Sequence, residues 1–61
     1  MVSFEQLERI AREMGYDSVD VVRFKHKDRI VLQRKGITIR LFLKTKIENL
    51  TEKELRKMLQ W

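Results

Sequence analysis

Apolar residues recur every three to four positions near the start of the chain, which is the spacing of one face of an α-helix. The stripe consists of Phe4, Leu7, Ile10, Ala11 and Met14. Ser3 and Gln6 have the spacing of a capping box, and Gly15 stands where a left-handed residue commonly ends a helix. The pattern predicts a helix over residues 4–14.

After residue 19 the apolar positions follow the alternation that is typical of half-buried β-strands. The clearest segment is 37–44, where aliphatic residues alternate with mostly polar ones. Two earlier runs, 19–24 and 30–32, are separated from each other by a short polar turn, and Gly36 separates the second run from the third. Because both turns are short, the three strands are expected to form an antiparallel meander.

A second capping box, Thr51 and Glu54, opens the last apolar stripe. The stripe contains Leu55, Met58 and Leu59 and predicts a helix over residues 52–60. The whole chain, residues 1–61, is therefore expected to be one small α+β domain in the order α-β-β-β-α, with both helices packed on one face of the sheet.

Alternation also assigns each strand residue to one of the two faces of this sheet. The face covered by the helices is predicted to hold Val22, Phe24, Ile30, Leu32, Ile37, Ile39, Leu41 and Leu43. The open face is predicted to hold Val19, Val21, Arg23, Lys25, Arg29, Val31, Gln33, Lys35, Thr38, Arg40, Phe42 and Lys44. The open face would thus be mostly cationic, with a few apolar side chains among the charges.

The composition excludes several classes of protein. With 43% hydrophobic and 38% charged residues, the chain is too apolar for a disordered protein and too charged for a membrane protein. It has no cysteine and one histidine, which excludes disulfides and argues against a structural zinc site, and no cofactor or metal is expected. We expect a cytoplasmic protein without membrane contact, and the abundance of Lys, Arg and Glu resembles the composition of proteins from heat-loving organisms.

The positive charge is concentrated in the middle of the chain. The net charge is +5, but nine of the 14 Lys and Arg residues lie between positions 23 and 46, where Asp28 is the one carboxylate. Such asymmetry is typical of proteins with an anionic partner, most often nucleic acid. A face that is charged only for solubility is the alternative interpretation.

We therefore expect a non-catalytic module that binds nucleic acid, RNA in preference to DNA, or single strands, with weak sequence specificity. Phe42 is the candidate for stacking on a base. The residues expected to neutralise phosphates are Arg23, Lys25, Lys27, Arg29, Lys35, Arg40 and Lys44. An alternative use of the same face is a homodimer interface centred on Val21, Val31 and Phe42.

The predicted order of elements resembles the double-stranded-RNA-binding domain, and several residues resemble the HicA toxins, small mRNA interferases built on that fold. Gly15-Tyr16 corresponds to the end of their first helix, and 55–59 corresponds to their closing helix. His26 lies near the start of the second strand, as the catalytic histidine of that family does, although Phe24-Lys25 replaces the family's Gly-Ser. The resemblance implies a ribonuclease with His26 as its catalytic residue and an antitoxin as its partner.

Overall fold

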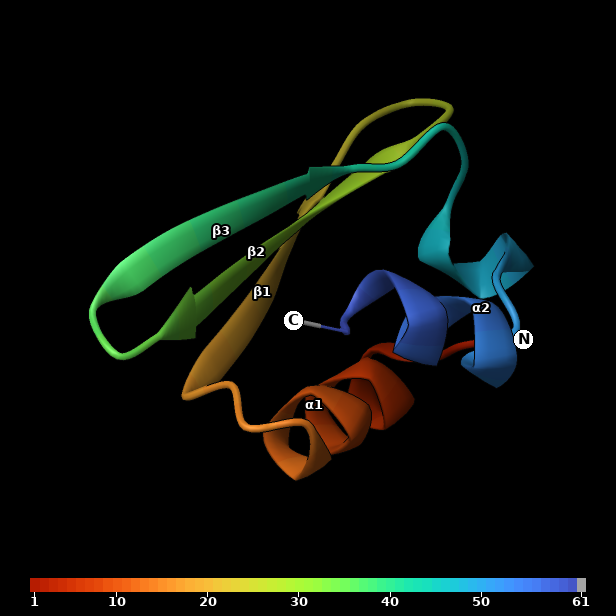
Figure 1. Ribbon diagram of the computed structural model, residues 1–61. Coiled ribbons are helices and arrows are strands. Elements are labelled where there is room, and N and C mark those ends of the chain that lie inside the picture. Colours follow the sequence, from red (N-terminus) through yellow and green to blue (C-terminus); the bar gives the residue numbers. More distant parts are fainter. Residues whose placement is uncertain (61) are drawn as a thin grey trace.

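The computed structural model describes residues 1–60 and has the predicted order of elements (Figure 1). Its helices and strands are α1 (Phe4–Glu13), β1 (Ser18–Arg23), β2 (Asp28–Arg34), β3 (Ile37–Phe42) and α2 (Glu52–Met58). A single 3-10 turn, η1 (Ile47–Asn49), precedes α2. The predicted α+β class and α-β-β-β-α order are confirmed, and α2 ends two residues before the predicted end.

Both helices begin with the predicted capping boxes. The Ser3 hydroxyl accepts the Gln6 N–H at 3.2 Å, and the Gln6 side chain accepts the Ser3 N–H at 2.9 Å. Thr51 and Glu54 make the same reciprocal pair at 3.1 and 2.9 Å. Each box satisfies two backbone donors that the first turn of a helix cannot satisfy itself.

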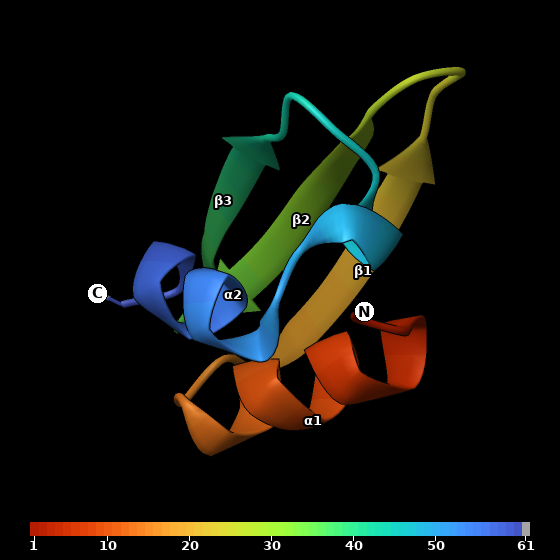
Figure 2. The same ribbon diagram turned by 90° about the vertical axis from the view of Figure 1, so that its right-hand side faces the viewer.

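The three strands form an antiparallel sheet in the order β1-β2-β3, so β2 is the central strand. Both helices lie on the same side of this sheet, which leaves its other face open (Figures 1 and 2). Strands β2 and β3 are joined by the two-residue turn Lys35-Gly36, whose φ angles of 51° and 80° are those of a type I′ hairpin.

The core between sheet and helices is aliphatic apart from Tyr16. Its members are Val2, Leu7, Ile10, Ala11, Tyr16, Ile30, Leu32, Leu43, Ile47, Leu50, Leu55 and Leu59. The Tyr16 hydroxyl donates a hydrogen bond of 2.7 Å to the carbonyl of Leu59, and so connects the end of α1 to the end of α2. Within residues 1–60, no helix is long and apolar enough to cross a bilayer.

The predicted faces are wrong for β1. Val19 and Val21 pack against the core, whereas Val22 and Phe24 are 41% and 38% exposed. The pairing of Val21 with Ile30 sets this register, and a shift of one residue moves every side chain of a strand to the other face.

The predicted faces are largely correct for β2 and β3. Ile30 and Leu32 are fully buried, and Ile39 and Leu41 pack against the core. Ile37 was also predicted to be buried, but it is the first residue of β3 and is 53% exposed.

Replacing the turn glycine should destabilise the fold through backbone strain alone. A Cβ at Gly36 would meet no atom within 4 Å, but the φ of +80° disfavours any L side chain. We expect Gly36→Ala to lower the free energy of unfolding by about 1–2 kcal/mol in urea denaturation. Lys35→Asn, which suits a left-handed φ better, should raise it slightly. Equal stability of Gly36→Ala and the natural chain would contradict the type I′ assignment.

Candidate nucleic-acid interface

The structure divides the predicted phosphate-binding residues among four places. Arg29 and Arg40 point to the open face, because they alternate with core residues along β2 and β3. Lys25 and Lys27 lie in the β1–β2 loop, and Lys44 follows β3 at the same end of the sheet (Figure 1). Lys35 lies in the turn at the opposite end, and Arg23 lies on the helix side.

The structure places Arg23 on the helix side of the sheet and not on the open face, where it was predicted. Its register opposite Asp28 turns it toward the helix layer, where it bonds the Asp28 carboxylate at 2.7 Å. Its two terminal nitrogens also donate to the two oxygens of Glu48, at 3.2 and 2.9 Å. The Glu48 carboxylate raises the pKa of Arg23, and Arg23 in turn lowers the pKa of Glu48. Arg23 is therefore occupied by carboxylates and faces away from the open surface.

Asp28, expected to be a residue of a polar turn, is instead a fully buried carboxylate at the start of β2. It accepts the Ile47 N–H at 2.8 Å and the Lys46 ammonium at 3.2 Å, in addition to the bond from Arg23. Burial alone would raise the pKa of Asp28, but the Ile47 N–H and the two cations outweigh it and leave the pKa below its ordinary value. The only signal in the sequence is that a single carboxylate interrupts a long basic segment.

The open face carries an arginine between two phenylalanines at the end where Asp28 lies. The register places Arg29 directly beside Phe42, and Phe24 follows β1 on the other side. The guanidinium carbon of Arg29 lies over both rings, 5.1 Å from the centre of Phe24 and 4.6 Å from that of Phe42. These distances are those of cation–π contacts. Phe42 is nevertheless 69% exposed, so most of its ring is open to a ligand.

We call this end of the open face the basic–aromatic platform. It consists of Phe24, Lys25, Lys27, Arg29, Phe42 and Lys44. All four cations lack an ion pair among residues 1–60, whereas the neighbouring Asp28 is fully compensated. The platform thus combines exposed rings with uncompensated positive charge, which is the combination used by proteins that bind single strands.

Of the other predicted residues, His26 lies in the same loop, and Arg40 lies one cross-strand row from the rings, opposite Val31. His26 is exposed and makes no hydrogen bond with any other described residue. In the part of the chain that the structure describes, no three His, Asp or Glu side chains come together in a way that could hold a metal ion. The structure therefore places the imidazole near the platform without orienting it.

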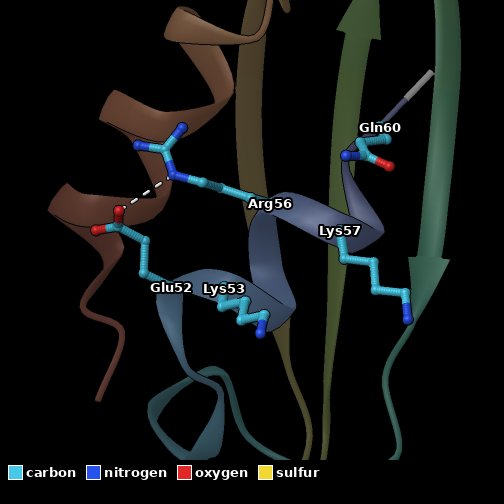
Figure 3. Close-up of a pocket in the computed structure, with 5 residues that line it drawn as sticks. All are labelled: Glu52, Lys53, Arg56, Lys57 and Gln60. Atoms are coloured by element: carbon cyan, nitrogen blue, oxygen red, sulfur yellow. Dashed lines mark hydrogen bonds and ion pairs between the residues drawn. The ribbon is translucent and has the colours of Figure 1, made fainter.

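A shallow hollow on α2 brings together none of the predicted residues (Figure 3). It is lined by Glu52, Lys53, Arg56, Lys57 and Gln60. Arg56 pairs with Glu52 at 3.1 Å and with Glu13 of α1 at 3.0 Å, so its charge serves to join the two helices. The hollow lies on the helix layer, away from the open face, and we assign it no site.

Neutralising Asp28 should destabilise the fold in a pH-dependent way. We expect Asp28→Asn to lower the free energy of unfolding at pH 7 by about 2 kcal/mol, because its charge-assisted bonds are lost. The pKa of Asp28 is lower in the folded state, so its contribution is present above the unfolded pKa of about 4 and is lost as the pH falls through the folded pKa. The difference from the natural chain, measured in urea, should therefore shrink below pH 4.

Asp20→Asn is the matched control, because Asp20 is exposed on the open face and, among residues 1–60, its side chain bonds only the adjacent Val21 N–H. Its effect should stay within about 0.5 kcal/mol. Equal effects of the two substitutions at pH 7 would show that the buried carboxylate contributes nothing to stability.

No protein-family model matches the chain, and neither a curated protein nor a solved structure is significantly similar to it. The geometry of the basic–aromatic platform is therefore the basis for a function.

Proposed function

We propose that this protein binds single-stranded nucleic acid, RNA in preference to DNA, through the basic–aromatic platform and without catalysis. The observation that carries the proposal is the exposed ring of Phe42, which has the Arg29 guanidinium over it at 4.6 Å and unpaired lysines in the adjoining loops. In this mechanism a base stacks on the ring, while the lysine ammonium groups neutralise the neighbouring phosphates.

The exposed rings favour single strands over duplexes. Inside a duplex each base is already stacked on its neighbours, so a flat protein ring gains no contact with a base face. The first turn of α2 is a poor alternative grip, because its Glu52 and Glu54 carboxylates repel phosphates. We propose RNA in preference to DNA as the ligand because the αβββα order resembles that of double-stranded-RNA-binding domains and HicA-type interferases.

Removing the exposed ring should weaken binding. We expect Phe42→Ala to raise the Kd for a fluorescently labelled 12-nucleotide RNA about tenfold, since stacking on one aromatic ring contributes about 1–3 kcal/mol. Phe4→Ala is the matched control, because Phe4 is also exposed (42%) but lies on α1. Fluorescence anisotropy measures both. Equal Kd values for the two variants would show that RNA does not bind through the Phe42 ring of the open face.

The lysines of the platform should determine how binding depends on salt. Each phosphate contact contributes about 0.7 to the slope of log K against log salt for single strands. We expect the double substitution Lys25→Gln and Lys44→Gln to reduce that slope by about 1.4 between 50 and 300 mM salt. The pair Lys53→Gln and Lys57→Gln removes the same charge from α2 and should leave the slope unchanged. Equal slopes for both double variants would argue against phosphate contacts at the platform.

The same mixtures separate binding from cleavage when they are run on a denaturing gel. A binding module leaves the RNA at its original length. If the natural chain shortens the RNA and His26→Ala does not, the interferase interpretation replaces the proposal of a non-catalytic module.

A further inference from the structure

Arg29 differs from the other cations of the platform in how firmly it is held. Its side chain emerges from the central strand β2, and its guanidinium lies over two rings that belong to the flanking segments. Its Nε is buried without a hydrogen-bond partner, and its two terminal nitrogens reach solvent and also have no partner among the described residues. The lysines, in contrast, lie in loops at the rim. Arg29 thus presents a fixed pair of coplanar donors at the centre of the platform.

This arrangement determines which ligand groups Arg29 can bind. The guanidinium carbon lies 5.1 and 4.6 Å from the centres of the two rings and Nε is buried, so the donors left for a ligand are the two terminal nitrogens. This pair of donors is complementary to two acceptors lying side by side in one plane. In a nucleic acid these are either two phosphate oxygens or the O6 and N7 atoms of guanine.

The position of Arg29 favours the base. A base stacked on the exposed ring of Phe42 would lie beside Arg29, which is paired with Phe42 across the strands. The exposed rim already carries Lys25, Lys27 and Lys44, which are flexible point charges suited to phosphates. Arg29, at the centre of the platform, is therefore available to contact the edge of a base.

We infer that Arg29 reads the Hoogsteen edge of guanine, so that the platform prefers single strands with a guanine beside the stacked base. The inference rests on the proposed function and adds sequence selectivity to it. A rigid bidentate contact of this kind discriminates between bases, whereas the lysines and the Phe42 ring accept any base.

The test compares a ten-nucleotide oligouridine with the same strand carrying one central guanine. We expect the natural chain to bind the guanine-containing strand about tenfold more tightly. Replacing that guanine by 7-deazaguanine removes the N7 acceptor and should abolish the preference without any change to the protein. Equal affinity for all three strands would overturn the inference.

Arg29→Lys keeps the charge but removes the planar pair of donors. Its affinity for the guanine-containing strand should fall about tenfold further than its affinity for oligouridine, so the preference for guanine is lost. Arg40→Lys, at the other arginine of the open face, is the matched control and should keep the preference. If Arg29→Lys weakens binding to both strands by the same factor, Arg29 contacts a phosphate and the inference is wrong.

These outcomes separate the inference from the function on which it rests. Oligouridine that binds with the expected dependence on salt and on Phe42, but without a preference for guanine, would contradict only the role of Arg29. Absence of binding to every strand would contradict the proposed function and this inference together.

Discussion

The buried carboxylate of Asp28 is the constraint on which the candidate site depends. It lies at the start of the central strand and binds groups from both neighbouring segments: Arg23 at the end of β1, and Lys46 and the Ile47 N–H beyond β3. Lys46 also donates to the carbonyl of Phe24. One side chain therefore fixes the spacing of the segments that carry the two rings of the platform, and the rings can hold Arg29 because that spacing is fixed.

The same carboxylate also helps to determine which cations of the middle segment are compensated and which are not. On the helix side, Asp28 and Glu48 compensate Arg23 and Lys46, which are half-exposed or partly buried there. On the open face and in the adjoining loops no carboxylate plays that role for Arg29 or the platform lysines among residues 1–60. Four uncompensated positive charges are consequently gathered at one end of one face, in a chain whose net charge is +5. Local concentration of this kind attracts a polyanion more strongly than the same charge spread evenly.

Local signals in the sequence predicted the elements, whereas the site depends on contacts between distant residues. The capping boxes at Ser3 and Thr51 lie within single turns, so their spacing alone identifies both helix starts. The faces of β1 were predicted wrongly because Val21 and Val22 are adjacent and equally apolar, so alternation gives no contrast there. The role of Asp28 depends on Ile47, which is 19 residues away and which no periodicity connects to it.

The exposure of the phenylalanines is the remaining feature that the fold itself does not explain. The core is built from aliphatic residues and Tyr16, while Phe4, Phe24 and Phe42 are all at least 38% exposed. A domain of this size can bury only about 60% of its unfolded surface, so large apolar side chains left outside reduce its stability. A single exposed ring such as Phe4 is common on protein surfaces. Two rings flanking one arginine are different, because they come from segments far apart in the sequence, and stacking on a planar ligand would remove their apolar surface from water.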